Sequence, residues 1–177
     1  MKSLNDKISI EGLNSITQAH TMYIEFFIRG DYNWWYEVGP GDIVVDIGAC
    51  VGFFTCLALD KGAKKVYSVE PNPNLVNTIL KNTAVHTVNK QENPLVIVNK
   101  AIGTENCFLK NIHGDTDNFK PCSIKFKDFI EFYNIEYIDY LKIDCEGGEY
   151  DILTTENLNF LKNKVKHIAI EVHLDCF

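Results

Sequence analysis

Asp46 is followed by two glycines, Gly48 and Gly52, and this spacing could form a ligand-binding loop. The apolar residues 43–45 precede the aspartate, and an aromatic pair that begins with Phe53 follows the second glycine. The pattern predicts a strand, a tight turn and the start of a helix. A bound small molecule is a common reason for a carboxylate and exposed backbone N–H groups to meet at such a point.

The spacing of the glycines separates two classes of ligand. In the dinucleotide pattern G-x-G-x-x-G, counted from Gly48, the second and third glycines would stand where this chain has Cys50 and Phe53. A side chain at the second position would crowd a pyrophosphate, which disfavours a dinucleotide. S-adenosylmethionine has no phosphate. Asp46 can receive its ammonium, directly or through water, and Glu70, at the end of the next expected strand, can accept hydrogen bonds from both ribose hydroxyls.

Three side chains are candidates for the general base of a transfer to oxygen, because a hydroxyl nucleophile must lose its proton. They are Asp144, Glu146 and His173, each expected near the carboxyl end of a strand. Alternatives stay open for all three. Asp144 could cap the following helix or hold an amine of the cofactor, and His173 could be a surface or interface residue. Asp144 and Glu146 could share a divalent cation, but no further carboxylate is evident nearby, so we predict no metal ligands.

Strands and helices alternate from residue 43 onward, which predicts a sheet that positions these groups at its edge. The expected class is α/β, a doubly wound and mostly parallel sheet with helices on both faces, in which ligands bind at the carboxyl ends of the strands. The expected strands begin at residue 43 and span residues 65–70, 95–98, 140–145 and 167–173. The expected helices span residues 15–28, 52–61, 74–82, 126–133 and 147–153.

The chain has the length of one domain, and we divide it into two parts. Residues 1–38 form an amino-terminal helical and aromatic segment, and residues 39–177 form a cofactor-binding core with an insertion at about residues 104–125. The helix at residues 15–28 and the aromatic residues 34–36 could pack on the sheet or form a lid over the substrate.

Four segments resemble the FkbM family of S-adenosylmethionine-dependent methyltransferases. They read VDIGA with GFF (residues 45–49 and 52–54), VEPNP (69–73), NKAIG (99–103) and LKIDCEGGE (141–149), within a similarity that covers about residues 40–173. The resemblance implies a Rossmann-like methyltransferase fold and a methyl group transferred to a hydroxyl oxygen of a sugar, lipid or small metabolite.

The resemblance also implies which residues contact S-adenosylmethionine. Asp46, Gly48 and Gly52 would line the methionine end, Glu70 and Asn72 the ribose and adenine side, and Ala101 the adenine wall. Asp144 and Glu146 would stand where the reaction occurs. The predicted cofactor-binding residues are Asp46, Gly48, Ala49, Gly52, Phe53, Thr55, Glu70, Asn72, Ala101 and Asp144.

Composition excludes several other classes of partner. The net charge is −7 and the lysines are scattered, which is unlike a nucleic-acid-binding surface. No stretch approaches the roughly 18 apolar residues of a membrane span. The six cysteines show no C-x-x-C pair and no secretory leader precedes them, so we expect free thiols and a cytoplasmic protein.

The end of the chain leaves two further expectations. The chain stops soon after the fifth expected parallel strand, so the carboxyl-terminal antiparallel strands usual in such methyltransferases are expected to be missing. Either a homodimer covers the apolar edge at residues 167–174, or the chain is a shortened form of a longer protein. A non-catalytic scaffold that binds S-adenosylmethionine is therefore the alternative function.

Overall fold

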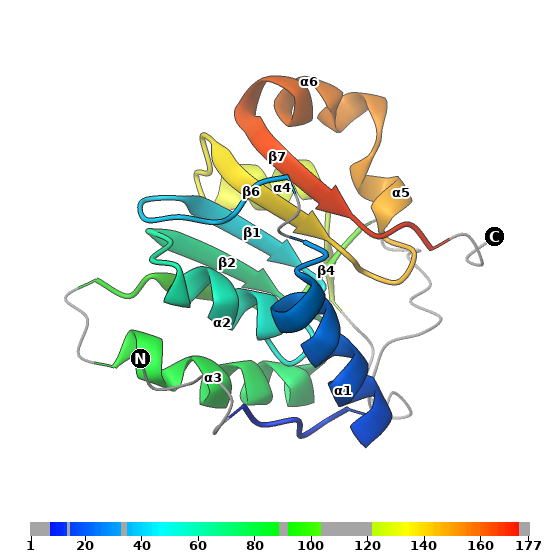
Figure 1. Cartoon of the computed structure of the whole chain (residues 1–177). Helices are drawn as coiled ribbons and strands as arrows, with labels where there is room; N and C mark the ends of the chain where they lie inside the picture. The colour runs from blue at the N-terminus through cyan, green and yellow to red at the C-terminus, as the bar shows by residue number, and fades with distance from the viewer. Residues whose placement is uncertain (1–7, 14, 33–34, 89–91, 104–121, 174–177) are drawn as a thin grey trace.

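A parallel five-stranded sheet forms the centre of the protein (Figure 1). The computed structural model describes residues 8–13, 15–32, 35–88, 92–103 and 122–173. The strand order is β3-β2-β1-β6-β7, and every neighbouring pair is parallel. The strands are β1 (Ile43–Ile47), β2 (Lys65–Val69), β3 (Leu95–Val98), β6 (Ile138–Ile143) and β7 (Val165–Ile170). The doubly wound α/β class predicted from the alternation of elements is confirmed.

Helices cover both faces of this sheet and enclose two apolar cores. One core contains residues of η2 and α2 and the buried Leu75 of α3, and the other contains residues of α4, α5 and α6. The helices are α1 (Ile16–Tyr23), its π-helical continuation η2 (Ile24–Arg29), α2 (Phe53–Asp60), α3 (Pro73–Thr87), α4 (Phe126–Phe132), α5 (Glu149–Ile152) and α6 (Thr155–Lys164). After β3 the chain returns to place β6 beside β1, so the direction of winding reverses between these two strands.

Three of the observed helices differ from the expected ones. The helix expected at residues 147–153 is the short α5, and α6 after it was not predicted. In α6 only Asn157 and Leu161 are buried, so its sequence has too few apolar residues to show a helical period. The helix expected at residues 74–82 continues to Thr87.

Most of the expected insertion, residues 104–121, lies outside the described residues. On either side of it, β4 (Ala101–Ile102) and β5 (Ser123–Ile124) pair in parallel as a separate small sheet. The end of the expected insertion therefore contains a short strand at residues 123–124.

The amino-terminal helix lies beside the arrowheads of β1 and β2 (Figure 1). Phe26 is buried and its ring stacks on Tyr32, with centroids 4.9 Å apart. Helix η2 therefore packs against the core, while α1 and η2 also line the cavity described below. No helix in the described part of the chain is long and apolar enough to cross a membrane.

Candidate functional site

A cavity of about 380 Å³ opens at the carboxyl ends of the strands, where a doubly wound sheet is expected to bind its ligand. Its walls come from the residues that follow β1, β2, β6 and β7, and from α1 and η2. Of the predicted site residues, those that line it are Gly48, Ala49, Glu70, Ala101, Asp144, Glu146 and His173. Asp46, Gly52, Phe53, Thr55 and Asn72 do not line it and lie in the layer of residues behind or beside it.

Gly48 allows the loops after β1 and β6 to touch. Its φ angle is +79°, and a Cβ atom at this position would lie 1.7 Å from the carbonyl oxygen of Asp144. The N–H groups of Gly48 and Ala49 both donate to the carbonyl oxygen of Val69, at 3.0 Å. A residue without a side chain is therefore required here by sterics, and the loop is fixed to the end of β2.

Glu70 is a buried carboxyl group at the end of β2. Its Oε2 accepts a hydrogen bond from the backbone N–H of Cys50 at 2.9 Å, and its Oε1 accepts one from the N–H of Asn72 at 2.8 Å. Burial raises the pKa of Glu70 to about 7, although these two hydrogen bonds oppose the rise. The φ angle of Cys50 is +54°, which is unusual for a residue with a side chain, so Glu70 holds a strained loop in place.

Three of the other predicted residues have structural contacts next to the cavity. The side chain of Asn72 accepts a hydrogen bond from the N–H of Asn74 at 2.9 Å and so caps α3. Gly52 precedes α2 with a φ angle of +83°. The ring of Phe53 packs edge-on against that of Phe26, with centroids 6.3 Å apart.

Behind the cavity wall, Asp46 belongs to a buried polar cluster. It is completely buried, its Oδ2 accepts a hydrogen bond from the Thr55 hydroxyl at 2.7 Å, and its Oδ1 lies 3.3 Å from Nζ of Lys142. The Thr55 hydroxyl also lies 2.9 Å from that of Ser68. The carboxylate of Asp46 is thus paired within the protein.

Lys142 is the cation of this cluster. Only 1% of the residue is exposed, and its Nζ lies 3.4 Å from Oδ2 of Asp144 and donates to the carbonyl oxygen of Gly48 at 3.1 Å. Burial alone would lower the pKa of Lys142, but the charges of Asp46 and Asp144 raise it above its ordinary value. Lys142 therefore stays charged and connects the loops after β1 and β6.

Tyr32 connects the amino-terminal segment to the acidic groups of the cavity. Its hydroxyl lies 3.1 Å from Oδ2 of Asp144 and 3.0 Å from Oε2 of Glu171. Burial and the charges of these two carboxylates raise the pKa of Tyr32 well above its ordinary value, so the phenol keeps its proton. Because a phenol has one proton, it donates to one carboxylate at a time.

Glu149 organises the loop after β6. It is completely buried, and its two oxygens accept hydrogen bonds from the N–H groups of Cys145 and Gly147, both at 2.8 Å. Between them, Glu146 adopts a φ angle of +55°. Glu149 thereby holds Glu146 in a backbone conformation that is unfavourable for a residue with a side chain.

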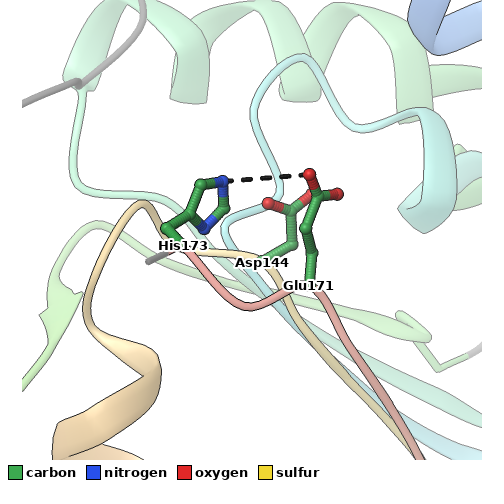
Figure 2. Close-up of side chains that lie close together, drawn as sticks. All are labelled: Asp144, Glu171 and His173. Atoms are coloured by element: carbon green, nitrogen blue, oxygen red, sulfur yellow. Dashed lines mark ion pairs between the residues drawn. The ribbon is translucent and has the colours of Figure 1, made fainter. Parts of the chain in front are cut away.

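His173 is oriented by the same buried glutamate. Its Nδ1 lies 3.1 Å from Oε1 of Glu149, and its Nε2 lies 3.5 Å from Oε2 of Glu146 and 3.9 Å from Oε1 of Glu171. Burial lowers the pKa of His173, but the hydrogen bond to Glu149 and the nearby carboxylates outweigh it, so the pKa is raised. Figure 2 shows His173, Glu171 and Asp144 side by side.

Sequence reasoning missed three residues of this site, which are Tyr32, Lys142 and Glu149. Glu171 was among the candidates expected at strand ends, but it was given no role. Lys142 and Glu149 belong to the segment LKIDCEGGE, where only the two acidic residues between them were assigned roles. Glu171 stands at an expected strand end, which was a usable signal. Nothing near Tyr32 in the sequence indicates that it reaches residues more than a hundred positions away.

Comparisons with known proteins agree with the geometry. The profile of the methyltransferase FkbM domain family matches residues 46–175. Among solved structures, the chain is similar to the FkbM methyltransferase of Methylobacillus flagellatus KT, with a TM-score of 0.57 and 17% sequence identity over 84% of this chain and 36% of that chain. It is also similar to precorrin 8w decarboxylase of Methanobacterium thermoautotrophicum, with a TM-score of 0.50 and 20% identity over 84% of this chain and 63% of that chain.

The structural similarities and the family match support different conclusions. The two structural similarities show a shared fold, and this chain spans less than two thirds of the length of either protein. The family match covers most of the chain. No curated protein matches the chain.

Proposed function

We propose that this chain, which belongs to the FkbM methyltransferase domain family, transfers a methyl group from S-adenosylmethionine to a hydroxyl oxygen of a sugar, a lipid or a small metabolite. The observation that carries the proposal is the composition of one cavity. The loop after β1, the buried Glu70 and the candidate bases Asp144, Glu146 and His173 all line it. A cofactor held by the loop after β1 and by Glu70 would therefore lie next to the candidate bases.

The residues of the cavity fit the chemistry of S-adenosylmethionine. Each oxygen of Glu70 accepts one backbone N–H, and because a carboxylate has about four acceptor positions, it can also receive ribose hydroxyls. Val69, Ala101 and Ile102 provide an apolar wall suited to adenine. Glu25 and the acidic groups after β6 and β7 suit a cationic methionine end. Asp46 would act from behind the wall, through Thr55 and Lys142.

The reaction needs a base and an orientation. When bound, the cofactor supplies a methyl group on a cationic sulfur, and the electron pair of the broken carbon–sulfur bond stays on that sulfur. The acceptor hydroxyl would lose its proton as its oxygen bonds to the methyl carbon, and Asp144, Glu146 and His173 are our candidates for the group that receives that proton. Glu149 fixes the direction of His173, and Lys142 and Tyr32 fix that of Asp144.

A second cavity lies beside the first and could admit the acceptor. It has a volume of about 450 Å³ and shares Glu25 and Glu171 with the first. Its walls include the rings of Tyr32, Trp35 and Tyr36. Flat apolar rings beside carboxylates suit a polar molecule with some apolar surface, such as a sugar or a lipid head group. We propose that the acceptor enters here.

The test is ligand binding followed by turnover. S-adenosylhomocysteine at about 100 times its dissociation constant should stabilise the fold by roughly 2.7 kcal/mol in a thermal denaturation experiment. A Glu70→Ala variant should lose most of this stabilisation, and Glu156→Ala, at an exposed position on α6, should keep it. If a nicotinamide dinucleotide stabilises the protein and S-adenosylhomocysteine does not, the cofactor assignment is wrong.

Turnover separates the enzyme from the alternative of a non-catalytic scaffold. Incubation with S-adenosylmethionine and a library of hydroxylated acceptors should give a product heavier by one methylene unit in mass spectrometry. Binding without product for any acceptor would favour the scaffold. We place the reaction in the cytoplasm, and Cys50, Cys56, Cys122 and Cys145, the cysteines that the structure describes, are free thiols.

A further inference from the structure

Asp144, Glu171 and His173 form a cluster of different metal-ligand types at one edge of the cavity. Strands β6 and β7 are neighbours, with Ile143 paired to Ile170, so the residues that directly follow the two strands lie side by side. One ligand atom from each of the three side chains lies within 4.8 Å of the others (Figure 2). The cluster offers two carboxylates and one imidazole.

His173 has the orientation that metal-bound histidines usually have. Its Nδ1 is hydrogen-bonded to the buried Glu149, at 3.1 Å, and Glu149 is itself fixed by the N–H groups of Cys145 and Gly147. The other nitrogen, Nε2, faces the carboxylates of Glu146 and Glu171. A carboxylate behind a ligating histidine fixes the tautomer and the ring direction, so that the free nitrogen is presented to the ion.

The charges at this edge are unbalanced. Asp144, Glu146, Glu149 and Glu171 bring four carboxylates together, and Lys142, the buried cation beside them, is shared between Asp144 and Asp46. The hydroxyl of Tyr32 can donate to Asp144 or to Glu171, but it adds no charge. Carboxylates this close together repel one another unless a cation or a proton neutralises them.

We propose that Asp144, Glu171 and His173 bind one divalent cation, and that Mn²⁺ suits this mixed set. Carboxylates favour Mg²⁺, Ca²⁺ or Mn²⁺, whereas an imidazole favours transition metals. Ligand atoms about 2.2 Å from one ion lie at most roughly 4.4 Å apart, so a small rotation of the half-exposed Glu171 side chain completes the set. Water or an acceptor oxygen would fill the remaining positions.

The role of the cation rests on the proposed function. A cation at this place would hold the acceptor hydroxyl and favour its deprotonated form. Asp144 and His173 would then be ligands, and Glu146 would be the carboxylate that receives the proton. The site itself requires no methyl donor, so its occupancy can be measured separately from catalysis.

The experiment is a titration of the whole 177-residue chain, treated with a chelator, with MnCl₂. Binding is measured by calorimetry and by the electron paramagnetic resonance signal of free Mn²⁺. One Mn²⁺ should bind per chain. Glu171→Gln and His173→Gln should each weaken binding by about 10- to 100-fold. Glu156→Gln and His20→Gln, matched changes on α6 and α1, should keep the wild-type affinity. Circular dichroism should show that all four variants are folded.

Each outcome either supports or overturns the site. No Mn²⁺ binding at millimolar concentration, or equal binding by the wild type and both site variants, overturns it. Parallel titrations with MgCl₂ and ZnCl₂ test the choice of ion, and a tighter Zn²⁺ complex lost in the same two variants would retain the site and overturn Mn²⁺. Methylation by a protein that binds no cation would keep the proposed function and remove the site. Cation binding without S-adenosylhomocysteine binding would keep the cation site and contradict the proposed function.

Discussion

Glu70 is a carboxyl group that folding removes from water, so its titration should be visible in the stability of the protein. Burial raises its pKa from 4.5 to about 7. The folded state therefore holds this proton more tightly than the unfolded state. The resulting stabilisation is present below about pH 4.5 and is lost as the pH rises through about 7. Its size should be roughly 3 kcal/mol.

The Glu70→Gln variant should remove this pH dependence. The measurement is urea denaturation of both proteins at several pH values between 4.5 and 8, without ligand. The difference in unfolding free energy between wild type and variant should shrink as the pH rises. Glu156→Gln, the same change at an exposed position on α6, serves as the control. A constant difference for Glu70→Gln would contradict the raised pKa.

Lys142 is the residue whose removal should be most damaging to the polar cluster. Lys142→Met would leave Asp46 completely buried without its cation, and the carbonyl oxygen of Gly48 without a donor. Removing one partner of a buried ion pair costs about 3–5 kcal/mol. We expect a loss of this size in urea denaturation at pH 7. The double variant Lys142→Met with Asp46→Asn should recover part of it, and a single-variant loss below about 1 kcal/mol would show that the pair is not needed.

At the scale of the elements, the contact between the loops after β1 and β6 predicts the effect of a substitution at Gly48. Gly48→Ala would place a methyl group 1.7 Å from the carbonyl oxygen of Asp144, in a backbone conformation that alanine avoids. The loops must separate, and we expect a loss of about 3 kcal/mol or more together with weaker binding of S-adenosylhomocysteine. Gly39→Ala is the matched control, because a Cβ atom there meets nothing within 4 Å. Equal stability of the two variants would refute the close approach.

The strands and helices also show how much of the fold could be predicted from the sequence. Apolar runs predict β1, β2 and β3 well, because every residue of these parallel strands is buried or partly buried. Helix α6 is not predicted from the sequence because its residues are mostly exposed and polar. Tertiary packing, rather than a periodic apolar pattern, makes this segment helical. Lys142 looked like an ordinary strand residue, because its burial depends on carboxylates that only the folded sheet brings near. The contact of Tyr32 with Asp144 likewise depends on the fold.

At the scale of the whole molecule, the edge strand β7 has a neighbour, β6, on only one side among the described strands. Ile168 on this strand is 42% exposed and Val172 beyond it is 45% exposed. An unpaired strand with apolar side chains favours pairing with another chain. We therefore keep the homodimer through residues 167–174 as a proposal, although residue 174 lies outside the described part of the chain.

If the protein forms this dimer, one lysine introduced on β7 should weaken it. Multi-angle light scattering should give a mass that rises toward twice 20.2 kDa with increasing protein concentration. Ile168→Lys should shift the equilibrium to the monomer, since a lysine on an edge strand opposes pairing. Leu158→Lys, at a similarly exposed apolar position on α6, should leave the mass unchanged. A wild-type protein that stays monomeric at every concentration would exclude the dimer, and β7 would then be an edge that the protein leaves open beside the second cavity.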